Sequence, residues 1–427
     1  MHFNYFDYSS GFKKVKKMKF HTLKIDLKNI HSEFSDYMAH RSCPLCGSEN
    51  FEVVHSLRDL QFFTDDSSQS KRVDIDDVAC TDCWLCYKNP CFTQKGFEVL
   101  FAECGASYGA TEGRQSEQIA WLSDRDMLAP GTKMLDVGCY DGLLLSALPD
   151  TITCMGVDID QPAIDRGNAR DPKLKLTYGS FENFSPTESP DVIFMFHVLE
   201  HVNNPAKVLA RLKEISNQSA RLVIEVPIVE GGTTNDLNGF FSTQHLTHFS
   251  RHTLYKMLEK GGWEVIEGQV MDGYNGFRLV VTHSLSEPLK EFFLLKDDLV
   301  YLKNVLDKSE SVKKEIQQLI TELPETGPLV IWGAGMHTEL LFQLTDLFAC
   351  EGRSFHLVDS DPMKIGKTWR GIPISHPSSV CDVNWPDSGA RLVTSTYGNQ
   401  FEIVKAAIKW GVPENQICTF YGEVNVY

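Results

Sequence analysis

A glycine-bracketed turn between two apolar segments is the first pattern in this chain that could do chemistry. Met134-Leu-Asp-Val137 is suited to a buried strand, and Gly138 and Gly142 bracket the turn that follows. Such a turn exposes backbone N–H groups and lets a ligand approach the main chain closely. Asp158, twenty residues after Gly138, ends a second apolar segment, where a carboxylate can accept hydrogen bonds from both ribose hydroxyls. A structural turn beside an unrelated aspartate is the alternative.

The charge of the turn discriminates between ligands. No third glycine is present to receive a pyrophosphate, and Asp136 places a carboxylate within the turn. A carboxylate repels phosphate but attracts a cationic ligand that carries an amino group. The turn therefore favours such a ligand over a dinucleotide.

Two pairs of cysteines have the spacing of a metal site. Cys43-Pro-Leu-Cys46 and Cys80-Thr-Asp-Cys83 each present two thiols across a short turn, and together they offer the four thiolates of a tetrahedral structural zinc. Cys86 and Cys91 follow closely, so the choice of ligands in the second half stays open. A redox CxxC pair is the rival interpretation, but no βαβ pattern surrounds either pair.

A third motif lies downstream, where Asp191-Val-Ile-Phe-Met-Phe196 predicts a strand that leads into His197-Val-Leu-Glu-His201. With Asp136–Gly142, this motif resembles the class I S-adenosylmethionine-dependent methyltransferases. The resemblance implies S-adenosylmethionine as the methyl donor. It also implies which residues bind this donor. The turn residues Asp136, Gly138, Asp141 and Gly142 would surround the methionine half, and Asp158 would bind the ribose. Ser180 and Phe181 would contact the adenine, and His197 would lie beside the donor at the edge of the sheet.

The order of strands and helices predicts an α/β fold. Apolar strands are expected at residues 133–137, 154–158, 174–178, 191–196 and 221–226, alternating with amphipathic helices, and two further strands at 264–270 and 277–283 are joined by a turn. This is the pattern of a seven-stranded methyltransferase sheet with one antiparallel strand. Residues 92–126 read as helical, with Phe97, Leu100 and Phe101 on one face.

The last hundred residues begin a second unit of the same kind. Leu329-Val-Ile-Trp332 enters the turn Gly333-Ala-Gly335, and a later strand ends at Asp359. Val393–Gly398 reads as a further strand and loop. These features predict a second Rossmann-like domain, with either a nucleotide-binding or a purely structural or docking role.

The module order as a whole resembles the sugar C-methyltransferases that act on nucleotide-linked deoxysugars. Shared local features include Glu225-Val-Pro227 and Asn275-Gly-Phe-Arg278. The implied domains are an N-terminal extension (1–40), a zinc-binding module (41–105), the methyltransferase domain (106–285), a connecting helix (286–323), for which an interaction coil is the alternative, and the Rossmann-like domain (324–427). The implied acceptor is a small molecule, a sugar or nucleotide-linked sugar.

The same family carries a histidine-rich segment that takes part in proton abstraction from the sugar. Here it reads Ser242-Thr-Gln-His-Leu-Thr-His-Phe-Ser250, in which His245 is retained and Ser242 and Gln244 replace a tyrosine and a glutamate. His245 is the leading candidate for the catalytic base and His248 the second. Gln244 cannot act as a base, whereas O-methylation needs only one base, which His245 can provide. O-methylation is therefore an alternative to C-methylation. A non-catalytic protein that binds the donor or a sugar in an assembly is the alternative.

Ser250 begins the pattern of an N-capped amphipathic helix, so His252 is expected to belong to the scaffold.

Composition narrows the class of partner and the compartment. The chain has 427 residues, enough for two to four domains, and a formal net charge of −16, which argues against nucleic-acid or anionic-membrane partners. No apolar run approaches the length of a membrane span. The lysines before residue 20 are followed by no apolar core, so no secretory signal is expected. A cytoplasmic location follows, in which the 12 cysteines are thiols or metal ligands.

Overall fold

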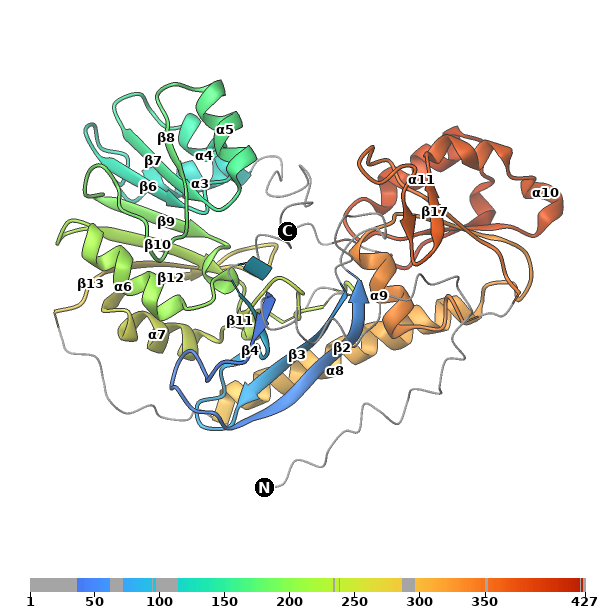
Figure 1. Cartoon of the computed structure of the whole chain (residues 1–427), viewed down its shortest axis with the longest axis horizontal. Coiled ribbons are helices and arrows are strands. Elements are labelled where there is room, and N and C mark those ends of the chain that lie inside the picture. The colour runs from blue at the N-terminus through green and yellow to red at the C-terminus, as the bar shows by residue number, and fades with distance from the viewer. Residues whose placement is uncertain are drawn as a thin grey trace. The chain divides into compact units, whose positions relative to one another are not determined.

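The computed structural model describes residues 37–61, 72–93, 95–96, 114–232, 235–237, 239–285, 296–349, 352–422 and 424 (Figure 1). The chain divides into two compact units, the larger comprising residues 31–60 and 73–312 and the smaller formed mainly by residues 313–422. The expected helical face of Phe97, Leu100 and Phe101 lies outside the described residues, whereas helix α3 (Arg114–Ser123) falls within the region expected to be helical. Over the described ranges, no helix is both long and apolar enough to cross a bilayer.

A mixed sheet forms the centre of the larger unit. Its strands are β6 (Lys133–Val137), β7 (Thr153–Asp158), β8 (Lys175–Tyr178), β9 (Val192–Phe196), β10 (Arg221–Val226), β12 (Trp263–Val270) and β13 (Phe277–His283). In the described part of the chain these seven strands take the order β12-β13-β10-β9-β6-β7-β8, and β13 runs antiparallel to both neighbours. The predicted methyltransferase-type sheet is confirmed.

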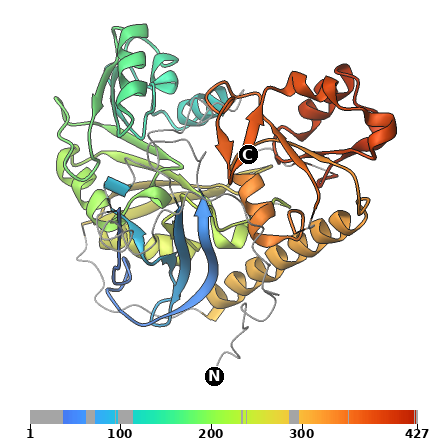
Figure 2. The same ribbon diagram turned by 45° about the vertical axis from the view of Figure 1, so that its right-hand side comes forward.

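Alternation along the strands gives the sheet two apolar faces. Leu135 and Val137 of β6 pack with helices α6 (Pro205–Ile215) and α7 (Arg251–Lys260), whereas Met134 packs with α3, α4 (Leu143–Ser146) and α5 (Gln161–Arg170) on the opposite face. Figures 1 and 2 show these two helical layers on either side of the sheet. Both faces of the central strands are therefore buried, as their nearly continuous apolar sequences predict.

Side-chain caps fix the beginnings of the helices that follow the strands. Asp160 accepts a hydrogen bond from the Ala163 N–H at the start of α5, and Asn204 accepts one from the Lys207 N–H in α6. The predicted cap at Ser250 is confirmed, because its hydroxyl accepts the N–H of Thr253 at 3.1 Å.

The cysteine-rich segment forms its own small sheet. Strands β2 (Phe51–Gln61), β3 (Arg72–Cys80) and β4 (Cys86–Lys88) are joined by β11 (Thr247–His248), in the order β11-β4-β3-β2, while β1 (Met38–Ala39) pairs with β5 (Cys91–Phe92). β11 belongs to the histidine-rich segment between β10 and α7. That segment is therefore built into the sheet of the cysteine-rich module.

The predicted second Rossmann-like domain is present in the smaller unit. β14 (Leu329–Trp332) lies parallel to β15 (Phe355–Val358) and β18 (Arg391–Thr394), with helices α9 (Met336–Leu344) and α11 (Gln400–Lys409) between the strands. β17 (Ile372–Ser375) pairs with β15 and with β16 (Thr368–Trp369), and β19 (Ile417–Cys418) pairs with β18. Helix α8 (Lys296–Thr321) occupies most of the described part of the segment for which a connecting helix is expected.

Candidate active site

A cavity of about 710 Å³ lies in the larger unit where the parallel strands end. The carboxyl edge of such a sheet is the usual place for a ligand, because the loops that follow the strands converge there. Most of the residues predicted to hold the donor line this cavity: Asp136, Gly138, Asp141, Asp158, Ser180, Phe181 and His197. Gly142 belongs to the same turn but is not among the lining residues of the described structure.

Both glycines of the turn have positive φ and no room for a side chain. Gly138 has φ +80°, and a Cβ there would come within 2.4 Å of Val198 Cγ2. Gly142 has φ +72°, and its Cβ would meet Leu174 and Leu176 at 2.9 Å, which makes it a packing position.

Two buried acids, Asp136 and Asp158, line the cavity. Asp158 closes the turn by accepting the N–H of Tyr140 at 2.8 Å and the N–H of Asp160 at 2.9 Å. Burial raises the pKa of Asp158, although these hydrogen bonds oppose the shift. Burial, together with the charge of Asp158, raises the pKa of Asp136 well above its ordinary range. A cationic ligand in the cavity would relieve both effects.

The remaining predicted donor residues are held by local contacts. Ser180 and Phe181 follow β8, and the Ser180 carbonyl accepts the N–H of Asn183 at 3.1 Å, which turns this loop along the cavity wall. The carboxylate of Asp141 binds Arg170 of α5 at 2.7 Å. Asp141 is therefore already paired, and its own contribution to the charge of the cavity is reduced.

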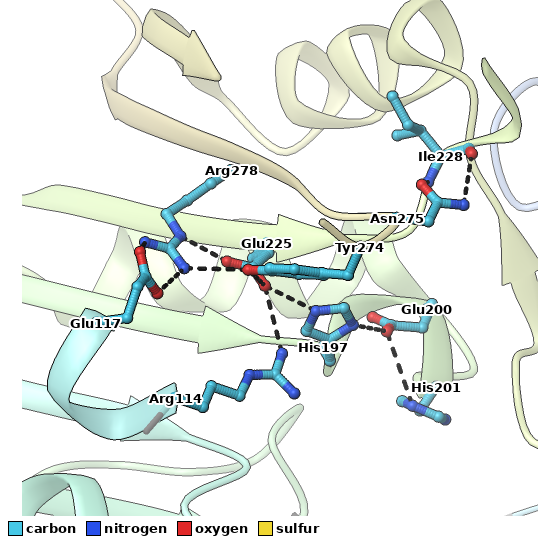
Figure 3. Close-up of polar contacts among 10 residues, drawn as sticks. All are labelled: Arg114, Glu117, His197, Glu200, His201, Glu225, Ile228, Tyr274, Asn275 and Arg278. Atoms are coloured by element: carbon cyan, nitrogen blue, oxygen red, sulfur yellow. Dashed lines mark hydrogen bonds and ion pairs between the residues drawn. The ribbon is translucent and has the colours of Figure 1, made fainter. Parts of the chain in front are cut away.

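His197 lies between two buried carboxylates at the end of β9 (Figure 3). Its Nε2 is 2.7 Å from Glu225 Oε1, and its Nδ1 is 3.4 Å from Glu200 Oε1. Burial disfavours its charged form, but the two carboxylates outweigh this effect and raise the pKa of His197. The arrangement therefore favours the charged imidazolium form of His197, which suits a residue that orients the site better than one that acts as a free base.

Glu225 is the centre of the polar network around His197 (Figure 3). Besides His197, it accepts Arg278 Nε at 2.5 Å and the Tyr274 hydroxyl at 2.8 Å, and Arg114 lies 3.3 Å away. Burial would raise the pKa of Glu225, but His197 and Arg278 outweigh it and lower the pKa to about 2. Glu225 is therefore an ionised anchor.

His245 reaches the cavity from the loop before β11. Its ring is 4.8 Å from the ring of His201, in an edge-on arrangement, and its buried Nδ1 has no hydrogen-bond partner among the described residues. Burial, with a smaller effect of His201, holds the pKa of His245 well below its ordinary value. Its imidazole is neutral and has a nitrogen lone pair to offer.

His248 is placed differently, although it is three residues further along. Its Nε2 is 3.0 Å from Asp77, whose carboxylate also binds Lys88 at 2.7 Å and His55 at 3.2 Å. The side chain of His248 is buried and, within the described structure, lies outside the cavity wall. The structure thus brings His245, but not His248, to the cavity. His252 is paired with Asp298 at 2.8 Å, in keeping with a scaffold role.

The four predicted cysteine ligands are gathered at one point. Their sulfur atoms all lie within 4.8 Å of one another, and the Cys43–Cys83 and Cys46–Cys80 pairs are 3.5 Å apart. Four sulfurs at about 2.3 Å from one zinc would be separated by about 3.8 Å, so the donor set fits that ion. Cys86 and Cys91 are not part of this group in the described structure.

Several site residues were not singled out from the sequence. Glu200 and His201 lie inside the recognised His197–His201 motif, which offered a signal, whereas Arg114 and Tyr274 come from other elements and carried none.

Comparison with known proteins agrees with this geometry. Residues 112–268 match the model of a family described as "Methyltransferase domain". The mitochondrial ubiquinone biosynthesis O-methyltransferase of Candida albicans is 34% identical over 86 residues, covering 18% of this chain and 26% of that protein. The corresponding enzyme of Glaesserella parasuis is 28% identical over 118 residues, covering 25% and 50%. The chain thus spans half or less of the length of these curated relatives.

Among solved structures, the magnesium protoporphyrin IX methyltransferase of Synechocystis PCC 6803 is 15% identical with a TM-score of 0.35, and the match covers 45% of this chain and all of that one. The S-adenosylmethionine-dependent methyltransferase of Clostridium acetobutylicum is 10% identical with a TM-score of 0.34, covering 44% and 98%. The family match, the sheet and the cavity together define the class: residues 112–268 form an S-adenosylmethionine-dependent methyltransferase domain of class I.

We predict that Asp136→Asn stabilises the ligand-free protein at and above neutral pH. The pKa of Asp136 is raised by burial, so the folded state holds this proton more tightly than the unfolded chain does. The cost of burying the charge is absent below the ordinary pKa of aspartate and grows as the pH rises toward the raised value. Thermal unfolding between about pH 5 and about pH 8 should show a gain of about 1–2 kcal/mol, or about 2–6 °C, at the upper end.

Asp150→Asn is the control, because the Asp150 side chain is 93% exposed. A variant at Asp136 that is less stable than the wild type throughout this range would contradict the interpretation.

The cysteine cluster generates a second prediction. Purified protein should contain about one zinc ion per chain, and Cys43→Ser should lower the metal content together with the thermal stability, because a closed four-thiolate site stabilises the fold. Elemental analysis and thermal unfolding are the measurements, and Cys381→Ser, at an exposed thiol, is the matched control. Folded, purified protein without metal would show that the cluster is not a zinc site.

Proposed function

We propose that the protein transfers a methyl group from S-adenosylmethionine to a sugar or a nucleotide-linked sugar, by O- or C-methylation, in the biosynthesis of a cell-surface polysaccharide or a secondary metabolite. The observation that carries the proposal is the cavity in the methyltransferase domain, whose wall includes the buried acids Asp136 and Asp158 and also His245, which has one nitrogen without a hydrogen-bond partner among the described residues. The activity needs a donor and an acceptor about 3 Å apart and a route for the acceptor's proton. The cavity offers residues for each of these tasks.

The donor would bind to the part of the cavity wall formed by the ends of β6, β7 and β8 and the loops that follow them. Asp158 would accept hydrogen bonds from the ribose, and Ser180 and Phe181 would contact the adenine. The charge of Asp136 suits the cationic methionine half of the donor, and Gly138 leaves the main chain open to it. The donor supplies a methyl group on a positively charged sulfur, which an acidic cavity stabilises.

The acceptor would approach from the side of the histidine-rich loop. His245 lines the cavity, and its buried Nδ1 has no partner among the described residues, so it is the residue we propose to act on the acceptor. His248 is already bound to Asp77, and the proposal does not extend to it. Gln244 occupies the position at which a carboxylate would support carbon chemistry, which favours a hydroxyl as the methylated group.

The proposed acceptor class rests on module order. A four-cysteine module, a methyltransferase domain and a C-terminal Rossmann-like domain occur together in sugar methyltransferases of the resembled family, and we extend the domain boundaries given above to this protein on the same basis. The curated relatives are named ubiquinone biosynthesis O-methyltransferases, which makes a phenolic hydroxyl the second candidate. A panel of nucleotide-linked deoxysugars and simple catechols, followed by S-adenosylhomocysteine release, separates the two.

The non-catalytic alternative makes a different prediction for the same panel. A protein that only binds the donor or a sugar in an assembly would bind S-adenosylmethionine but release no S-adenosylhomocysteine with any acceptor.

Removal of the proposed ribose contact should weaken donor binding. We expect Asp158→Ala to reduce S-adenosylmethionine affinity by roughly 1.5–3 kcal/mol, as for the loss of hydrogen bonds to a charged acceptor. Isothermal titration is the measurement. Asp359→Ala in the smaller unit is a matched control, because Asp359 closes its own glycine turn through the N–H of Ala334 at 2.7 Å. Unchanged donor affinity in the Asp158 variant would move the ribose contact elsewhere, first to Asp160.

Substitution of His245 should affect turnover and spare donor binding. We expect His245→Asn to lower the rate of S-adenosylhomocysteine formation by about a hundredfold or more, since the acceptor would lose the group that assists its deprotonation. Donor affinity should stay within about twofold, because the predicted donor contacts are made by other residues of the cavity wall. Nearly full turnover in this variant with an accepted sugar would remove His245 from the mechanism.

A further inference from the structure

A cluster of two histidines and one glutamate lies at the wall of the methyltransferase cavity. Glu200 and His201 end the motif after β9, and His245 comes from the loop before β11. One possible ligand atom from each of the three residues lies within 4.8 Å of the others. His201 and His245 both line the cavity, so the cluster faces space that a small ligand can enter.

Three buried atoms of the cluster have no hydrogen-bond partner among the described residues. Glu200 is 1% exposed, yet neither of its carboxylate oxygens makes a hydrogen bond of ordinary geometry within the described residues, and the same is true of His245 Nδ1. Leaving a buried carboxylate without a hydrogen-bond partner is costly. Such a group in a native structure calls for an explanation, and a bound cation would supply one.

Two histidines lie near Glu200, but neither makes a short contact with its carboxylate. Glu200 Oε1 lies 3.4 Å from His197 Nδ1 and 3.8 Å from His201 Nε2, as the dashed lines in Figure 3 show. Both distances exceed those of a charge-assisted hydrogen bond, about 2.7–2.9 Å. His197 already makes its short contact with Glu225, at 2.7 Å. These positions therefore surround Glu200 without satisfying it.

The histidine orientation is set in the manner typical of metal ligands. His201 Nδ1 lies 3.0 Å from the carbonyl oxygen of Gln244, which fixes a tautomer with the proton on Nδ1 and leaves the Nε2 lone pair free. A backbone bond of 2.7 Å from the Leu246 N–H to the Glu200 carbonyl ties the two segments together. The loop that carries His245 is thus held against the motif that carries the other two residues.

We propose that Glu200, His201 and His245 bind one divalent transition-metal ion, such as Mn²⁺ or Zn²⁺, at the acceptor side of the cavity. Two imidazoles and one carboxylate on one side of an ion leave other coordination positions open, which suits a site that receives a substrate oxygen. Ligands of one ion at about 2.1 Å lie about 3–3.5 Å apart, and the 3.8 Å between Glu200 and His201 approaches this spacing.

This inference rests on the proposed function and refines the part played by His245, whose lone pair is given to the ion and not to the acceptor's proton. The acceptor hydroxyl loses its proton to solvent when its oxygen binds the ion. An oxygen lone pair then forms the bond to the methyl carbon, and the electron pair of the breaking carbon–sulfur bond stays on sulfur. The products are the methyl ether and the neutral thioether, so charge and atoms balance.

Mn²⁺ binding tests the site without any acceptor. Mn²⁺ prefers oxygen and nitrogen ligands, so it distinguishes this cluster from the four-cysteine site. The zinc-containing protein is titrated with Mn²⁺, and the electron paramagnetic resonance signal of free Mn²⁺ is measured at each addition. The titration should show about one bound Mn²⁺ ion per chain. Glu200→Gln and His201→Asn should each weaken binding by at least about tenfold, and His376→Asn, at an exposed histidine of the smaller unit, should not.

Mn²⁺ binding and methyl transfer, measured separately, distinguish a failure of the metal site from a failure of the proposed function. Glu200→Gln keeps the size of the buried side chain, so without Mn²⁺ the variant should remain folded, yet it should lose the Mn²⁺-induced rise in Tm. Absence of Mn²⁺ binding, or binding that these variants leave unchanged, would overturn the metal site. Mn²⁺ binding without methyl transfer to any acceptor of the panel would leave the site standing and refute the proposed function.

A final measurement tests the role of the ion in turnover. The protein is dialysed against a chelator that leaves the cysteine-bound zinc in place, and turnover is measured with an acceptor that the enzyme methylates. Turnover should fall by at least about tenfold, and added Mn²⁺ should restore it. Turnover that is insensitive to this treatment would return His245 to the role of a direct base and overturn the catalytic part of the inference.

Discussion

The ion pair between Glu225 and Arg278 is the interaction on which the architecture of the site depends. The two residues are directly opposed across β10 and β13, and both are completely buried. Burying such a pair is costly unless its remaining hydrogen-bonding groups are satisfied, and here Glu117, Tyr274 and His197 complete it. The last antiparallel strand of the sheet is thereby linked to the edge where His197 meets the cavity.

The sequence could specify the glycine-turn side of the cavity, formed by Asp136, Gly138 and Asp158, because the signals there are local. A buried strand, a turn with two glycines and an acid at the end of the next strand are written within about 25 consecutive residues, and strand order follows from the right-handed connections between them. The assignment of Asp136, Gly138 and Asp158 to one cavity needed little more than this pattern. The same reasoning identified the second Rossmann-like unit, whose Asp359 takes the turn-closing role of Asp158.

The part of the cavity wall that carries His245 was harder to predict because its geometry depends on contacts between residues far apart in the sequence. His245 and His248 belong to one polar segment, and nothing in their spacing tells which of them faces the cavity. The decision is made by Asp77, 171 residues away from His248 in the sequence, which holds that imidazole in the cysteine-rich module. Likewise, the environment of His197 depends on Arg114 and Tyr274, which the fold brings to Glu225 from two other elements.

The insertion of β11 into the sheet of the cysteine-rich module has a consequence for folding. The glycine-turn side consists of contacts between neighbouring strands and helices, whereas the position of His245 also requires β4 and the side chain of Arg41, which binds the Leu246 carbonyl across 205 residues. Such high contact order delays the completion of this part of the molecule relative to the glycine-turn side. A newly synthesised chain would therefore complete the glycine turn before it completes the part of the cavity wall that carries His245.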